Sequence, residues 1–122
     1  MPRQDGQAAL SASPVAAISR EIVRIHARFY GRGPSKAKTV WHGEIVVCVL
    51  EEIYTPAERL LVARGRFADV RASRLAFQDQ VEPLLREAVE AATDRRVQAF
   101  LGQVSPGGVA AEVFGLEHRS TD

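Results

Sequence analysis

The sequence predicts an α+β domain, in which helices pack on one face of a mostly antiparallel four-stranded sheet. Two pairs of short apolar segments are each joined by a glycine-containing turn, which is typical of β-hairpins. Helical periodicity precedes the first pair and separates it from the second. The predicted order is therefore α-β-β-α-α-β-β. We expect a single domain over residues 13–118, with disordered tails at residues 1–12 and 119–122.

The first helix is predicted to begin at Ser13 and Pro14, a serine N-cap followed by a proline in the first turn. Apolar residues then recur at spacings of three and four, which predicts one buried stripe made of Val15, Ile18, Ile22, Ile25 and Phe29. Gly31 stands where a helix commonly ends in the left-handed conformation.

The first hairpin combines the strand "AKTVW" (37–41), a turn at His42 and Gly43, and the strand "EIVVCVLEEIY" (44–54). Gly43 can supply the positive φ of a tight turn. The second strand is apolar on both faces from Ile45 to Leu50, which predicts a central position in the sheet. Helices would cover one of its faces, and we expect a second subunit to cover the other. The sequence therefore favours a homo-oligomer, with a dimer as the first choice.

The sequence "TPAE" at residues 55–58 predicts the start of a short helix that ends near Gly65. Thr55 and Glu58 can each bond the other's backbone N–H, and Pro56 suits the first turn. A longer helix is expected over about residues 69–92, with a kink or a break at Pro83. Its inward-facing residues are expected to be Val70, Phe77, Val81, Leu84, Ala88 and Val89.

The second hairpin follows from "RRVQAFLGQV" (95–104) and "VAAEVFGLE" (109–117), which the turn-rich sequence "SPGG" joins. No apolar run approaches the ~20 residues that a membrane-spanning helix needs. We therefore expect a soluble, cytoplasmic protein, in which any membrane role passes through a partner.

Composition and residue types exclude several classes of site. The formal net charge is +1, so no strong overall field attracts nucleic acid. Cys48 is the only cysteine, which excludes an intramolecular disulfide and a cysteine metal site, and it is expected to be buried. The three histidines lack partners at metal-binding spacings, and no nucleophile motif is present. The sequence therefore predicts neither a cofactor nor a metal and no catalytic residues, although it leaves an enzyme open.

The candidate binding residues lie in the loop after the first helix and are Gly31, Arg32, Gly33, Pro34, Lys36 and Lys38. Glycines allow a close approach of the backbone to a ligand, and the three cations offer charge-assisted hydrogen bonds to an anion. The loop follows a helix C-terminus, however, where the helix dipole disfavours anions, and it matches no nucleotide-binding fingerprint. Two interpretations stay open: a site for an anionic ligand or partner, and a structural turn with solvated charges.

An alternative function for the protein is nucleic-acid or nucleotide binding. Arg20, Arg24 and Arg28 are spaced four apart and predict an exposed cationic ridge on the first helix. This ridge and the basic loop would contact phosphates, and Tyr30 and Trp41 would stack on bases. The near-neutral remainder of the chain makes nucleic acid the less favoured partner.

The segments "SREIVRIHARFYGRGPSKAKTVWHGEIVVCVLEEIYTPAERLLVARGR", "VEAATDRRVQAFLGQV" and "AEVFGLE" resemble the MpsC-like domain family. The likeness covers about residues 13–117. Its motif residues are Gly31, Arg32, Gly33 and Pro34 in the first loop and Thr55, Pro56, Ala57 and Glu58 at the helix start.

The resemblance implies a small accessory or regulatory protein without established catalytic residues. It also implies a link to a cation-translocating, membrane-potential-generating system and to uptake of inorganic carbon, through a protein partner in a membrane transport complex. Where family members often carry acidic residues in the last hairpin loop, this chain reads "VSPGG", which argues against cation binding there.

Overall fold

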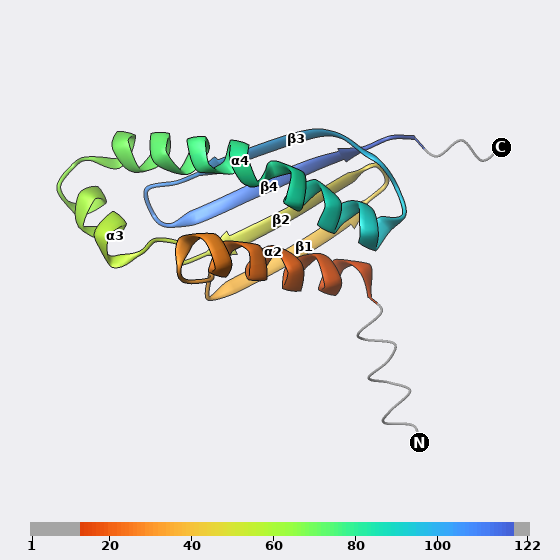
Figure 1. Cartoon of the computed structure of the whole chain (residues 1–122), viewed down its shortest axis with the longest axis horizontal. Coiled ribbons are helices and arrows are strands. Elements are labelled where there is room, and N and C mark those ends of the chain that lie inside the picture. The colour runs from red at the N-terminus through yellow and green to blue at the C-terminus, as the bar shows by residue number, and fades with distance from the viewer. Residues whose placement is uncertain (1–12, 119–122) are drawn as a thin grey trace, which may run out of the picture.

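The computed structural model describes residues 13–118, so the tails predicted at residues 1–12 and 119–122 lie outside the described part. Residues 13–118 form three helices and four strands in the predicted order, and Figure 1 labels them. The elements are α2 (Pro14–Tyr30), β1 (Lys36–His42), β2 (Ile45–Glu51), α3 (Pro56–Ala63), α4 (Phe67–Thr93), β3 (Val97–Val104) and β4 (Val109–Leu116). The predicted α+β fold class is confirmed.

The sheet consists of two hairpins that lie side by side. Its strand order is β1-β2-β4-β3, and every neighbouring pair is antiparallel. Strand β2 is central, as its apolar sequence predicted, and β1 and β3 form the edges. The first turn lies at Gly43 and Glu44, one residue later than predicted, since His42 still pairs with Ile45. Gly43 has the expected positive φ of 61°.

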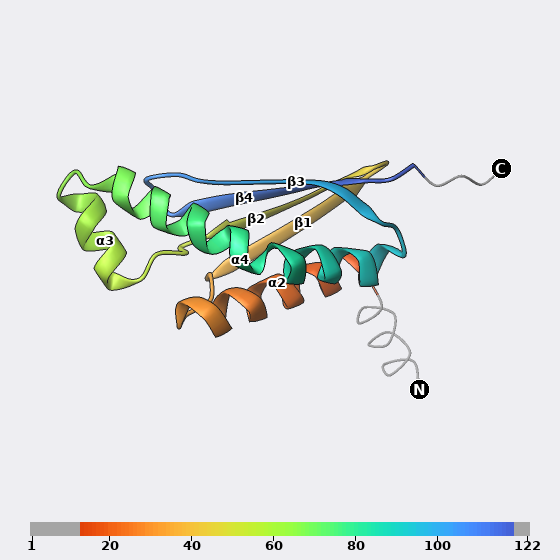
Figure 2. The ribbon, with the colours of Figure 1, turned by 45° about the horizontal axis from the view of Figure 1, so that its top comes forward.

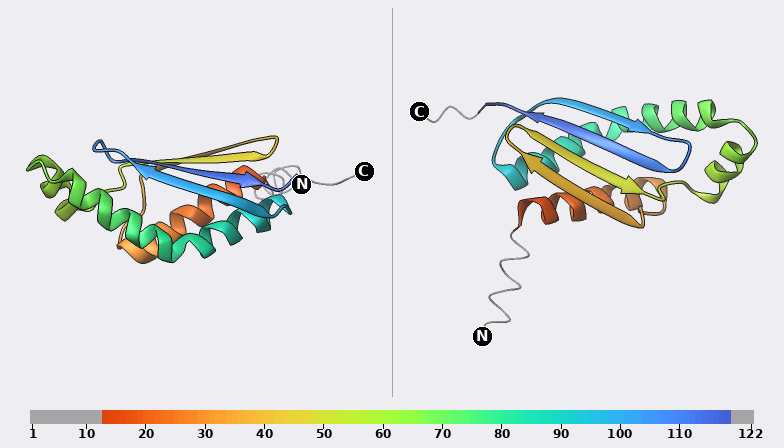
Figure 3. Two further views of the ribbon diagram at one scale, coloured as in Figure 1. Left: turned by 90° about the horizontal axis from the view of Figure 1, so that it is seen from above. Right: turned by 180° about the vertical axis from the view of Figure 1, so that it is seen from behind.

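Helices α2 and α4 lie next to each other across one face of the sheet, whereas α3 lies beyond the strand ends (Figures 1 and 2). Side chains alternate along a strand, so one face of β2 meets the helices. Val46, Cys48 and Leu50 are fully buried on that face. Ile18 and Ile22 of α2 complete the same core. None of the described elements covers the opposite face, which we call the open face (Figure 3).

Helix ends follow the sequence signals. Ser13 accepts a hydrogen bond from the Ala16 N–H at 3.4 Å, and Gly31 ends α2 in the left-handed conformation with a φ of 82°. The predicted break of the long helix is wrong, because α4 runs without interruption through Pro83. Pro83 is exposed, so the carbonyl group that loses its helical partner can face water, and the helix bends along the sheet (Figure 3).

The inward face of α4 differs in part from the prediction. Val70, Val81 and Val89 are buried as expected. Leu85 rather than Leu84 is fully buried, and the charged residue Arg74 occupies an inward position that apolar periodicity did not assign. This arginine organises the site described below.

We predict that Cys48 does not react with thiol reagents in the folded protein. The side chain is fully buried, so a reagent cannot reach the sulfur atom. Burial also raises the pKa of the thiol to about 11, so the reactive thiolate is scarce. An aromatic disulfide reagent at about pH 8 should react at least ~100-fold more slowly with native protein than with urea-unfolded protein. Equal rates in the two states would contradict the burial of Cys48.

Candidate functional site

Arg74 is a buried cation that joins four segments of the chain. The residue is 4% exposed, and its Nε and Nη2 atoms donate to the two oxygens of Glu58 at 2.7 and 2.6 Å. Nη2 also donates to the Ile53 carbonyl at 2.7 Å. The guanidinium lies 3.8 Å from the ring centroid of Tyr30, a cation–π contact. Arg74 therefore fixes α4, α3, the end of α2 and the segment after β2 relative to one another.

Glu58 also caps its own helix. The Thr55 N–H donates to Glu58 Oε1 at 2.9 Å, and the Glu58 N–H donates to Thr55 Oγ1 at 3.2 Å, which completes the predicted capping box. Burial alone would raise the pKa of Glu58, but the hydrogen bonds from Arg74 and Thr55 outweigh it and hold the pKa below its usual value. Glu58 is therefore a carboxylate committed to structure.

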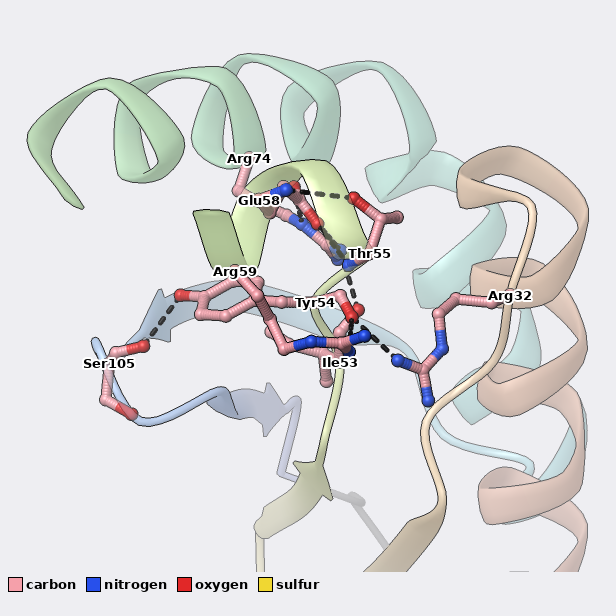
Figure 4. A network of polar contacts seen from close by, with 8 residues as sticks. All are labelled: Arg32, Ile53, Tyr54, Thr55, Glu58, Arg59, Arg74 and Ser105. Atoms are coloured by element: carbon pink, nitrogen blue, oxygen red, sulfur yellow. Dashed lines mark hydrogen bonds and ion pairs between the residues drawn. The ribbon is translucent and has the colours of Figure 1, made fainter. Parts of the chain in front are cut away.

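Two further arginines meet at the carbonyl oxygen of Tyr54 (Figure 4). Arg32, in the loop after α2, donates from Nη1 at 2.6 Å, and Arg59, in α3, donates from Nη1 at 2.9 Å. Because both Nη1 atoms bond the same oxygen, the distance between them cannot exceed the sum of the two hydrogen-bond lengths. Neither arginine is paired with a carboxylate among residues 13–118. Like charges this close repel, and each guanidinium keeps further N–H groups for another acceptor.

A pocket of about 600 Å³ opens beside these guanidinium groups. Pockets of this size accommodate small organic ligands. Its walls combine charged, apolar and backbone surfaces, contributed by Arg32, Glu52, Tyr54, Arg59, Val62, Ala63 and the turn at residues 106–108. We call it the Arg32–Arg59 pocket.

Local contacts hold the pocket in shape. Tyr54 is 3% exposed and donates its hydroxyl to the Ser105 carbonyl at 2.6 Å, and burial raises the pKa of this phenol. The Ile53 N–H donates to the Gly108 carbonyl at 3.1 Å. Gly108 has a φ of 84°, and Glu52, at the pocket rim, has a φ of 55° that is uncommon for a residue other than glycine. Such backbone strain clusters at ligand-binding sites.

The structure separates the predicted binding residues. Arg32 lines the Arg32–Arg59 pocket, whereas Lys36 and Lys38 lie on β1 and border a hollow on the open face. Gly31 ends α2, and Gly33 lies close to α2, where an added Cβ would come within 3.3 Å of Val23. Pro34 continues the loop into β1 and lines neither hollow. Of the predicted set, Arg32 is therefore the cation that shares a hydrogen-bond acceptor with an arginine from another element.

Arg59 and Glu52 were missed by sequence reasoning. Arg59 follows a motif that a helix start explains completely, and Glu52 follows the end of a strand. No spacing rule connects either residue with Arg32. Arg59 reaches the Tyr54 carbonyl from α3, and Arg32 reaches the same oxygen from the loop after α2 (Figure 4).

The cationic ridge on α2 is interspersed with other groups. Arg24 pairs with Glu21 at 3.0 Å, and Arg28 lies 5.0 Å from the ring centroid of Phe29. Glu21 and Glu87 border the same groove between α2 and α4. The ridge is therefore partly neutralised by its surroundings.

A second buried polar pair joins α2 to β4. His26 and Glu112 are 6% and 3% exposed, and the Nε2–Oε2 distance is 3.1 Å. The Oε1 atom of Glu112 has no hydrogen-bond partner within the described structure. Across the same residues, no group of His, Cys, Asp or Glu side chains is arranged to hold a metal ion.

A family model described as "Na+-translocating membrane potential-generating system (MpsC)" matches residues 13–117, which is most of the chain. The chain belongs to the MpsC family. The resemblance inferred from the sequence is thereby confirmed. No match was found among curated proteins or solved structures. Within residues 13–118, no helix of this MpsC protein is long and apolar enough to cross a membrane.

We predict that the change Glu58→Gln lowers the free energy of unfolding at neutral pH by about 3–5 kcal/mol, because it leaves the buried Arg74 cation without a counterion. The pKa of Glu58 is lowered in the folded state, so its contribution is complete above the ordinary value of 4.5 and is lost as the pH falls through the folded pKa. The variant should therefore lose less stability than the wild type between about pH 5 and pH 2.

Urea unfolding followed by circular dichroism over this pH range measures both effects. Glu87→Gln is a matched control, because Glu87 is an exposed glutamate of α4 without an ion pair in the described residues. Identical acid profiles for wild type and Glu58→Gln would contradict the assigned role.

Proposed function

We propose that this protein is a non-enzymatic accessory module of the MpsC type and that it binds an anionic group in the Arg32–Arg59 pocket. The family description supports a role linked to a Na+-translocating, membrane-potential-generating system. Contact with such a system would pass through a protein partner. The link to inorganic carbon uptake and the cytoplasmic location stay predictions.

One observation carries the anion site: Arg32 and Arg59 converge on a single neutral oxygen. A carbonyl dipole compensates two positive charges only in part, and a bound anion would compensate them fully. Both guanidinium groups keep further donors, and the pocket that the two arginines line is large enough for a ligand.

The environments of Cys48 and Glu58 make both side chains poorly suited to catalysis, which favours a binding function. Cys48 is buried with a raised pKa, so it is a poor nucleophile. Glu58, which directly precedes Arg59 in the sequence, is held by Arg74 and Thr55 and is therefore a poor base.

The second part of the proposal is a homodimer formed through the open face. One apolar row crosses all four strands of the sheet. It consists of residues that are partners in register: Val40, Val47, Val113 and Leu101. Leu101 is 70% exposed and Val40 is 52% exposed. Two such sheets can pack face to face, and contiguous exposed apolar surface of this kind commonly marks an interface.

The ridge of Arg20, Arg24 and Arg28 offers less support for nucleic-acid binding. Glu21 pairs with Arg24, and the neighbouring Glu87 would face a phosphate backbone.

The anion site predicts that phosphate or a simple carboxylate shifts the NMR signals of the Gly107 and Gly108 amides. Arg32→Gln or Arg59→Gln should weaken this binding at least ~10-fold, because each change removes a charge and a hydrogen-bond donor. Arg24→Gln, which changes an exposed arginine of α2, should leave the affinity unaltered. The absence of any shift with every anion would disprove the proposed site.

The dimer predicts that Leu101→Lys shifts the molar mass measured by light scattering during size-exclusion chromatography from that of a dimer to that of a monomer. A charge at the β3 end of the apolar row would be buried unpaired on association. Leu60→Lys is the control, because Leu60 is 55% exposed on α3. A wild-type protein that is monomeric at micromolar concentration would refute dimer formation.

A further inference from the structure

We infer that the Arg32–Arg59 pocket selects a ligand with a single carboxylate on an apolar body, and that Glu52 sets this preference. The inference rests on the proposed anion site and adds its ligand class. Three features of the pocket carry it: its charge balance, its donor arrangement and its apolar wall.

The first feature is the net charge of the lining side chains, which is one positive charge. Arg32 and Arg59 are the cations that line the pocket, and Glu52 is its only acidic lining residue among those described. Glu52 makes neither an ion pair nor a hydrogen bond within the described chain. A monoanion therefore brings the site to neutrality, whereas a dianion overcompensates it and meets repulsion from Glu52.

The second feature is the arrangement of donors. Each arginine uses Nη1 for the Tyr54 carbonyl, and the other nitrogen atoms of its guanidinium group have no hydrogen-bond partner in the described structure. Guanidinium groups match the planar geometry of carboxylates especially well. A carboxylate between Arg32 and Arg59 would accept from both while the Tyr54 carbonyl keeps its present bonds.

The third feature is an apolar wall beside the cations. Val62 and Ala63 of α3 lie on one part of the lining, and Pro106 lies on another. A volume of about 600 Å³ far exceeds what a bare carboxylate or phosphate fills. The apolar part of a ligand would remove this wall from water, which a small inorganic anion does not do.

The same chemistry occurs in free aliphatic acids and in the C-terminal carboxylate of a peptide with an apolar last residue. Four probes distinguish these sources from simple anion binding: hexanoate, acetyl-alanyl-leucine, the amide of that peptide, and inorganic phosphate. Affinities can be measured from NMR shifts of the Gly107 and Gly108 amides in the full chain.

For the wild type, we expect hexanoate or the free-acid peptide to bind at least ~10-fold more tightly than phosphate and than the peptide amide. Glu52→Gln should raise the affinity for phosphate about 10-fold, because it removes the repelling charge. Arg59→Gln should weaken the binding of every carboxylate probe. Glu87→Gln, a distant exposed glutamate of α4, is the control and should change nothing. Thermal unfolding of each variant confirms that it is folded.

Tighter binding of hexanoate identifies free acids as the source, and tighter binding of the peptide acid identifies a C-terminus; both support the inference. If phosphate binds wild type as tightly as either carboxylate, in a manner that depends on Arg59, the ligand class is wrong while the anion site stands. An unchanged phosphate affinity in Glu52→Gln overturns the role of Glu52. If no probe binds, the inference and the anion site both fail.

Discussion

The ion pair of Arg74 and Glu58 is the contact on which the local structure depends. A nearly buried guanidinium must have its donors satisfied, and here a carboxylate, a carbonyl group and an aromatic ring surround it. Removing one partner is costly, although the complete pair need not add net stability relative to a well-packed apolar alternative. Its main effect is therefore geometric, because few arrangements of α3 and α4 allow all these contacts at once.

This geometry reaches the candidate site through one short segment. Arg74 bonds the Ile53 carbonyl, Glu58 bonds the Thr55 N–H, and Tyr54 lies between them with its ring anchored on Ser105. The residues on both sides of Tyr54 are thus fixed independently of the hydrogen bonds that Arg32 and Arg59 donate to its carbonyl group. A site fixed in this way loses little conformational entropy on binding, which favours affinity for a small ligand.

Local interactions explain why most of the fold was predictable. The capping box at Thr55 and Glu58 and the turn at Gly43 involve residues within a few positions of one another, so the sequence shows them directly. Burial of Arg74 was not predictable, since its partner is 16 residues away in another helix. The pairing of His26 with Glu112 likewise joins segments that only the folded sheet brings together.

The cations of the predicted binding loop lie in two places in the fold for a related reason. Consecutive side chains alternate along a strand, and register places Lys38 beside Val49 on the open face, while Arg32 still belongs to the preceding loop. A run of cations in sequence therefore becomes two separate features in space. The partner that Arg32 gained instead, Arg59, comes from a helix whose local motif gave no indication of it.

The two proposed surfaces meet at the turn between β3 and β4. Gly108 belongs to the Arg32–Arg59 pocket, and the next residue, Val109, is exposed on the open face, where it is in register with Glu51. The Gly108 carbonyl also accepts from Ile53, next to the residue that carries the shared carbonyl oxygen. If both proposals hold, a ligand that shifts this turn changes the edge of the dimer interface, and dimer formation restricts the turn. By thermodynamic linkage, the two binding events would then influence each other by equal factors. An accessory protein can regulate a partner in this way, by converting occupancy of a small pocket into a change of assembly.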